Sequence, residues 1–168
     1  MIREYEPARD WVALRACTVA LQEAERKLEP GLPEGERMAD DYLAHLLARC
    51  SRDSGRIFVA EEEGEVVGFV GVLASVLPEE LDEDPAPHAY VSDLVVLPPQ
   101  RRRGLGRALL VRAEDFARRS GATRLRVGVL AGNRPAARLY RSAAFRDYRL
   151  ELTKDLRQWP VAQGAMAR

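Results

Sequence analysis

Apolar residues in the first fifty positions recur every three or four residues, which is the spacing of an amphipathic helix. This pattern predicts one helix over residues 11–28 and a second over residues 38–50. The stretch 30–33, which holds two prolines and a glycine, separates them. The apolar faces carry Trp11, Leu14 and Leu21 in the first helix and Tyr42, Leu43, Leu46 and Leu47 in the second.

From residue 55 onward the apolar pattern changes to that of strands. Residues 55–61 and 66–76 are joined by the acidic turn Glu62-Glu-Gly-Glu65, which predicts a β-hairpin. Two more strands are expected at the far end of the chain, near Phe145 and within residues 148–154.

A strand–helix–strand unit lies between the hairpin and these last strands. Residues 89–97 and 124–130 have strand patterns, and residues 104–120 form the helix between them, with Gly121 as its cap. Such a crossover makes the two strands parallel neighbours. We therefore expect an α/β fold with a mixed, mostly antiparallel sheet, a central parallel strand pair and helices on both faces. Residues 1–158 would form one domain, and 159–168 a flexible tail.

The turn that leads into the helix at 104–120 is built to hold a phosphate. Its sequence is Arg101-Arg-Arg-Gly-Leu-Gly-Arg107. Gly104 and Gly106 lack a Cβ atom, so consecutive backbone N–H groups can converge on an anion. The helix directs its unpaired amides and its positive dipole end toward the same point. Four guanidinium groups that suit phosphate oxygens surround it, on Arg101, Arg102, Arg103 and Arg107.

Two other phosphate-binding loops are excluded by their spacing. The Walker pattern ends in Gly-Lys-Ser/Thr, but the two lysines of the chain, Lys27 and Lys154, lie far from the turn. The dinucleotide fingerprint needs a third glycine, and position 109 is leucine. For this segment alone, a charged turn without a ligand is the remaining alternative.

Two motifs together resemble the GNAT superfamily of acyl-CoA-dependent N-acetyltransferases. The pattern Arg101-x-x-Gly104-x-Gly106, directly after a strand, is similar to the signature of that family. Asn133, followed by a helix that carries Leu139-Tyr140 and ends near Phe145, is similar to its second hallmark. Ala144 stands where the family usually has glycine. The resemblance covers residues 56–155.

The resemblance implies an N-acetyltransferase that moves an acetyl group from acetyl-CoA directly to a primary amine. The pantetheine arm would bind like an added strand to the backbone of Leu94, Val95 and Val96. Tyr140 would protonate the thiolate of coenzyme A. The other expected cofactor contacts are Arg101, Arg102, Arg103, Gly104, Leu105, Gly106, Arg107 and Asn133. For Asn133, a cap of the helix that follows is an equally good interpretation.

The sequence leaves several residues as candidates for the general base, the group that removes a proton from the amine. Asp93, His88 and Tyr90 lie on or just before the strand expected to carry the acyl site, and Asp93 is preferred as a contact for a cationic substrate. Side chains alternate along a strand, so Asp93 and Ser92 are expected to face opposite sides. The other candidates are Glu23, Glu25, the acidic loop at 79–84 and a chain of water molecules.

Charge is distributed unevenly along a chain whose net charge is zero. Residues 1–100 hold 9 basic and 21 acidic side chains, and residues 101–168 hold 17 basic and 5 acidic ones. If the two parts of the chain form the two sides of one cleft, the basic side would attract the phosphates of coenzyme A. The acidic side would attract a cationic amine. Zero net charge argues against a nucleic-acid partner. A non-catalytic acyl-CoA-binding module is the alternative function, and Tyr140 favours the enzyme.

The apolar stretches and the cysteines of the chain indicate where in the cell the protein is expected. No apolar stretch of the 168 residues reaches membrane length, and the N-terminus lacks a signal-like apolar run. Cys17 and Cys50 have no metal-ligand spacing. We therefore expect a cytoplasmic protein with free thiols and with no metal or membrane partner. The family resemblance adds the expectation of a homodimer.

Overall fold

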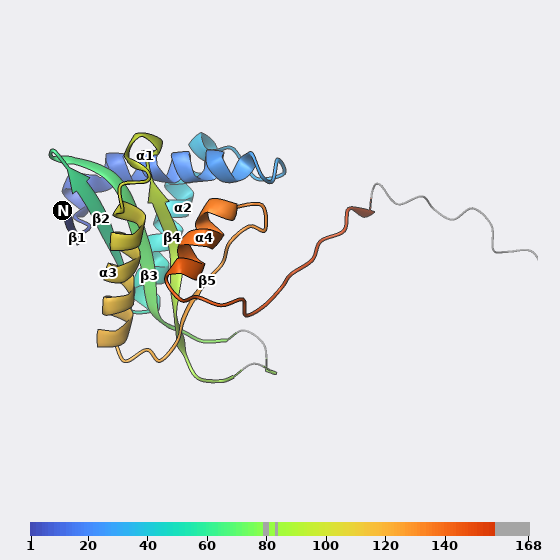
Figure 1. The fold of residues 1–168 in the computed structure, drawn as a ribbon. Coiled ribbons are helices and arrows are strands. Elements are labelled where there is room, and N and C mark those ends of the chain that lie inside the picture. Colours follow the sequence, from blue (N-terminus) through green and yellow to red (C-terminus); the bar gives the residue numbers. More distant parts are fainter. Residues whose placement is uncertain (79–80, 83, 157–168) are drawn as a thin grey trace, which may run out of the picture.

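Five strands form one sheet that lies between two layers of helices (Figure 1). The computed structural model describes residues 1–78, 81–82 and 84–156. β1 to β4 pair with their neighbours in antiparallel fashion, whereas β4 and β5 are parallel, which confirms the expected α/β class with a mixed sheet. In spatial order the strands are β1 (Ile2–Glu4), β2 (Arg56–Glu62), β3 (Glu65–Val76), β4 (His88–Val96) and β5 (Leu125–Val127).

The helices cover both faces of the sheet because adjacent residues of β3 point to opposite sides. On one face, Leu14 and Leu43 are fully buried against Phe69. On the other, Leu109 is fully buried and packs with Val70 in a second cluster. The first layer comprises α1 (Pro7–Arg26) and α2 (Gly35–Arg52), and the second comprises α3 (Leu105–Arg119) and α4 (Arg134–Ser142), with the short 3₁₀ helix η1 (Pro98–Gln100) before α3.

A β-bulge interrupts β4 at Ser92. Val72 of β3 pairs with Val91, and the next residue back, Gly71, pairs with Asp93, so Ser92 has no partner on β3. A Cβ atom at Gly71 would overlap the Ser92 hydroxyl, which explains the glycine there. A bulge shifts the alternation of side chains by one position.

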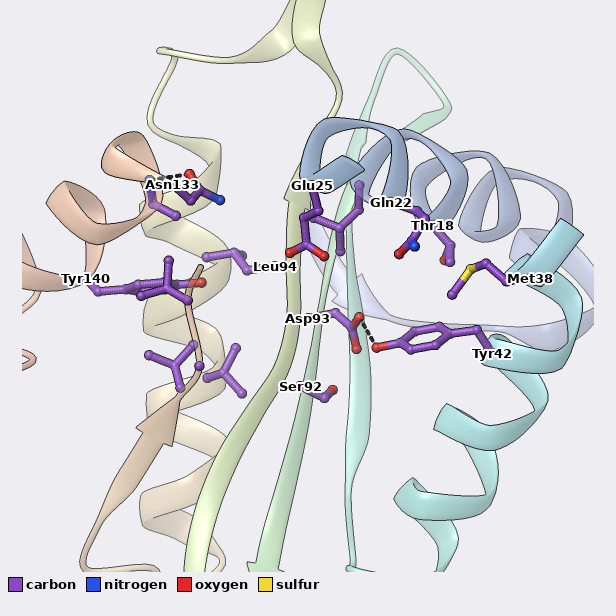
Figure 2. A pocket seen from close by; sticks show the side chains of 16 residues that line it. Thr18, Gln22, Glu25, Met38, Tyr42, Ser92, Asp93, Leu94, Asn133 and Tyr140 are labelled. Atoms are coloured by element: carbon purple, nitrogen blue, oxygen red, sulfur yellow. Dashed lines mark hydrogen bonds between the residues drawn. The ribbon is translucent and has the colours of Figure 1, made fainter. Parts of the chain in front are cut away.

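The pairing of the two parallel strands ends where this bulge begins. Their pairing runs from Ala89–Leu125 to Val91–Val127 and ends there. From Asp93 to Val96, β4 is therefore paired with β3 alone among the described strands. The unpaired edge of this segment lies on the side toward α4 (Figure 2).

Both N-terminal helices extend further than the apolar pattern predicts. α1 begins at Pro7, which fits the first helical turn because no N–H donor is needed there. α2 begins at Gly35 rather than at residue 38. β1, a three-residue strand at the edge of the sheet, was not predicted from the sequence. So short a segment shows no periodicity of its own.

The C-terminal strands predicted from the sequence do not form. The described residues after α4 contain no strand, so those expected near Phe145 and within 148–154 are wrong, and β5 covers only three residues of the predicted 124–130. A strand needs a neighbour with free backbone groups, and β5 offers a very short edge. Tyr148, Leu150 and Leu152 alternate as strand residues do but are exposed. The predicted tail at 159–168 lies outside the described residues, and the domain boundary at 158 stays a prediction.

Candidate active site

A cavity of about 130 Å³ lies where β4 and β5 diverge. α1, α2, β4, the segment after β5, and α4 all contribute to its lining (Figure 2). Ser92 and Asp93 both line it, which corrects the expectation that they face opposite sides. The bulge at Ser92 is the reason, because it breaks the regular alternation of β4 at this point.

Asp93 is the most deeply buried acid of this cavity, with 5% of its surface exposed. Its Oδ1 accepts a hydrogen bond of 2.6 Å from the Tyr42 hydroxyl on α2 (Figure 2). Its Oδ2 and the Ser92 Oγ are buried without a hydrogen-bond partner among the described residues. Burial raises the pKa of Asp93, and the nearby hydroxyls of Tyr42 and Ser92 and the charge of Arg49 oppose that rise. One oxygen of this carboxylate therefore has no hydrogen-bond partner among the described residues, although it is closed off from solvent in this structure.

Tyr140 reaches the same cavity from α4, on the opposite side from Tyr42 (Figure 2). Its ring belongs to the core on the α3 side and lies 5.8 Å from the ring of Phe145. Its hydroxyl has no hydrogen-bond partner in the part of the chain that the structure describes. Burial raises the pKa of Tyr140 to about 12, with a smaller contribution from the negative charge of Asp93. The phenol is therefore protonated at neutral pH, as a proton donor must be.

Glu25 on α1 is a second acid that lines the cavity. Burial raises its pKa first, and the negative charge of Asp93 raises it further. Sequence reasoning left Glu25 among several candidates and missed Thr18 and Gln22, which line the cavity beside it. The available signal was their spacing, because positions 18, 22 and 25 lie on one face of a helix.

Several other candidate bases do not line the cavity. Glu23 instead accepts a 2.8 Å hydrogen bond from the Gly35 backbone N–H and forms a 2.9 Å ion pair with Arg26, so it holds α1 to the start of α2. His88 is buried at the first position of β4, and Tyr90 pairs with Arg126 of β5. In the acidic loop, Asp84 binds Arg124, and residues 79, 80 and 83 lie outside the described part.

The predicted phosphate turn has the backbone that such a site needs. Gly104 has a φ of 84°, in the left-handed region that glycine adopts without strain. It precedes α3, and no side chain caps this helix end. The first N–H groups of α3 are therefore available to an anion.

The four arginines of the turn differ in their contacts. The Arg101 Nε donates to the Val96 carbonyl at 2.8 Å, and Arg103 pairs with Glu62 at 2.8 Å. Arg107 donates to the Ser142 carbonyl at 3.2 Å. The side chain of Arg102 has no such partner among the described residues. Of the four, Arg102 is the guanidinium most available to a ligand.

For Asn133 the structure shows the helix cap, one of the two interpretations that the sequence left open, and contact with the cofactor stays a prediction. Its Oδ1 accepts a 3.2 Å hydrogen bond from the Ala136 backbone N–H and so caps α4. It also lines the cavity. The cap uses the carbonyl oxygen and leaves the amide –NH₂ available as a donor.

Among the described residues, no group of three or more His, Cys, Asp or Glu side chains is placed to hold a metal ion. Within the same residues, no helix is long and apolar enough to cross a membrane. Cys17 and Cys50 are free cysteines, and burial raises the pKa of their thiols to about 12 and about 11.

Two curated proteins are similar to this chain. Streptothricin acetyltransferase of Streptomyces lavendulae is 36% identical over 91 residues, which cover 54% of this chain and 44% of that protein. Mycothiol acetyltransferase of Clavibacter sepedonicus is 32% identical over 143 residues, which cover 84% of this chain and 40% of that protein. The chain therefore spans less than half the length of these two relatives.

A solved structure shares the fold. It is that of AAC(6')-Iy in complex with the bisubstrate analog CoA-S-monomethyl-acetylneamine, with 18% sequence identity and a TM-score of 0.67. The match covers 92% of this chain and 97% of that one. The model of the Acetyltransferase (GNAT) family matches residues 19–145, which is more than half of the 168 residues. The chain belongs to the acetyltransferase (GNAT) family.

Proposed function

We propose that this protein transfers an acetyl group from acetyl-CoA to a primary amine by direct attack in a ternary complex. The observation that carries the proposal is the pair of unused groups in one cavity: the Asp93 Oδ2 and the Tyr140 hydroxyl. They lie beside the open backbone edge of β4. One group accepts a proton and the other donates one, as acyl transfer to an amine requires.

The cofactor would occupy the open edge of β4 and the start of α3. Among the described strands, the backbone of Leu94, Val95 and Val96 pairs with β3 alone. Apart from the Val96 carbonyl, which accepts a hydrogen bond from Arg101, its other side would be available to the pantetheine arm. The pyrophosphate would lie at the uncapped N-terminus of α3, near the turn from Arg101 to Arg107. The CoA portion of the analog bound to AAC(6')-Iy supports this cofactor for the same fold.

The reaction begins with an alkylammonium group, whose pKa is about 10. Asp93 Oδ2 removes its proton, and the neutral nitrogen forms a bond to the thioester carbonyl carbon. A backbone N–H at the open edge of β4 stabilises the oxyanion. The carbon–sulfur bond then breaks. The Tyr140 hydroxyl donates its proton to the thiolate of coenzyme A, and the nitrogen, which became positively charged when it attacked, releases its second proton to solvent and becomes the amide nitrogen. Asp93 and Tyr140 exchange their protons with solvent before the next turnover.

A thiol-release assay with acetyl-CoA and a panel of primary amines tests this function. We expect free thiol to appear only when an amine is present, together with an acetylated amine of the expected mass. A non-catalytic acyl-CoA-binding module makes a different prediction. It binds acetyl-CoA in calorimetry, but no amine in the panel accelerates thiol release.

The phosphate position is tested at Gly106. A Cβ atom there would lie 3.4 Å from a methyl carbon of Leu139 and 3.9 Å from one of Val96, so a small side chain fits the fold. Gly106→Val adds branches beside the N–H groups of the first turn, and we expect the Kd for acetyl-CoA to rise about tenfold or more, which is about 1.4 kcal/mol. Isothermal calorimetry measures the affinity.

Gly106→Ala is the matched control for this variant, since its single methyl group should weaken binding less than valine does. Melting temperatures of both variants verify that they are folded. Unchanged acetyl-CoA affinity in a folded Gly106→Val protein would show that the phosphate lies elsewhere.

The proposal includes a cytoplasmic location and a homodimer, both expected from the sequence. The free cysteines support a reducing compartment. The exposed, alternating side chains of Tyr148, Leu150 and Leu152 support a partner subunit, and Tyr148 lies against Arg126 of β5.

A further inference from the structure

The acceptor side of the cavity contains two acids with unused hydrogen-bonding capacity. Asp93 has a buried Oδ2 without a partner, and the Glu25 carboxylate accepts no hydrogen bond from the described residues. The described residues that line the cavity include no Lys, Arg or His. The lining therefore offers negative charge with no cation of its own.

Most of the other polar groups on this side donate to the protein itself, whereas the Ser92 hydroxyl has no partner among the described residues. The Thr18 hydroxyl donates to the Leu14 carbonyl at 3.0 Å, and the Gln22 Nε2 donates to the Pro33 carbonyl at 2.8 Å. The Tyr42 hydroxyl donates to Asp93. The Gln22 Oε1 and the two acids remain as acceptors. A ligand that fits this side must itself bring several N–H donors.

Donors are instead concentrated on the opposite side of the cavity. The Tyr140 hydroxyl and the Asn133 amide group lie on the α4 side, and Glu25, Gln22 and Thr18 lie on the α1 side (Figure 2). This division assigns the α4 side to the thioester and the α1 side to the acceptor.

One reacting ammonium group does not balance both acids. When Asp93 takes the proton of the acceptor, the attacking nitrogen and the carboxyl group both become neutral. Glu25 then stays negative in a partly desolvated cavity, where an unpaired charge costs free energy. A cation that does not take part in the reaction would stabilise Glu25 throughout the reaction.

On the basis of the function proposed above, we propose that the acceptor is a diamine or polyamine whose second ammonium group binds Glu25. A cavity of about 130 Å³ equals the volume of about four water molecules, so it holds the amine end of a slender molecule. An amine that carries a carboxylate near this end would be repelled by Glu25 and Asp93.

Three acceptors of equal chain length test the proposal: putrescine, butylamine and γ-aminobutyrate. We expect kcat/KM for putrescine to exceed that for butylamine by about tenfold, the equivalent of one partly buried ion pair. γ-Aminobutyrate should be the poorest of the three. Glu25→Gln keeps the shape of the side chain and removes its charge, so the ratio of putrescine to butylamine should fall toward one.

Glu29→Gln is the matched control, because it removes the same charge from an exposed position just beyond α1. It should leave the ratio of the two acceptors unchanged. A binding measurement independent of turnover is the rise in melting temperature when putrescine is added to the complex with coenzyme A. We expect this rise in the parent and a smaller one in Glu25→Gln.

The outcomes separate the inference from the function. Equal use of butylamine and putrescine, with no effect of Glu25→Gln on their ratio, would overturn the role of Glu25 and leave acetyl transfer intact. Amine-independent thiol release, or none at all, together with no thermal shift by putrescine, would reject both proposals.

Discussion

Asp93→Asn is expected to lower kcat/KM for amine acetylation by about 10²- to 10⁴-fold, the usual contribution of a general base. Asparagine has nearly the same shape, and its Oδ1 still accepts the hydrogen bond from Tyr42. The substitution removes the proton acceptor and little else. Steady-state kinetics with the best amine of the panel measure the loss. In the parent, the acidic limb of the pH profile of kcat/KM reports the protonation of this base. In Asp93→Asn this limb should be absent.

Asp40→Asn on α2 is the control, because Asp40 pairs with Arg15 at the surface and does not line the cavity. Its kcat/KM should stay close to that of the parent. Near-normal activity of Asp93→Asn would rule out Asp93 as the base.

The same variant should be more stable than the parent at neutral pH. Burial raises the pKa of Asp93, so folding favours the protonated carboxyl group, and this stabilisation is lost as the pH rises through the pKa of the folded state. Asparagine carries no charge at any pH. Thermal unfolding should show a higher melting temperature for Asp93→Asn at pH 7, and the difference should shrink as the pH falls.

Tyr140→Phe is expected to lower kcat by about 10²-fold while the affinity for acetyl-CoA stays unchanged. The lower end of the usual range for acid catalysis applies, because a phenol with a pKa of about 12 is a weak donor at neutral pH. Phenylalanine keeps the ring that packs near Phe145 and deletes only the hydroxyl. Turnover, acetyl-CoA affinity and melting temperature, measured on the one variant, separate proton donation from packing.

Tyr148→Phe provides a matched control, since it deletes a phenol hydroxyl whose partner is Arg126, outside the cavity. It should change turnover little. If Tyr140→Phe shows normal turnover and only a small change in melting temperature, Tyr140 is a core aromatic residue, and another group protonates the thiolate.

The phosphate turn and the helices could be predicted because their signals are local. The residues from Arg101 to Arg107 are contiguous, and the conformation of Gly104 and the start of α3 follow from short-range backbone sterics. The spacing of the leucines in α1 and α2 predicts which face of each helix is buried. The predicted C-terminal strands failed for the converse reason, because alternation at 148–154 does not supply a neighbouring strand.

The acceptor side of the cavity could not be derived from any single segment. Tyr42 looked like one more apolar residue of the second helix, and its hydrogen bond to Asp93 joins positions 51 residues apart. Ser92 and Asp93 line the same cavity only because a bulge breaks the alternation that strand periodicity assumes. Glu23 and Glu25 were equivalent candidates until the packing of α1 placed the first against Gly35 and the second at the cavity.

The order of residues along the chain thus accounts for the helices, the hairpin and the anion-binding turn, since hydrogen bonds and sterics between near neighbours decide them. Which acids share one cavity depends instead on how α1, α2 and α4 pack around β4. Burial then shifts the pKa values of Asp93, Glu25 and Tyr140, and desolvation is a property of the folded chain rather than of any residue type.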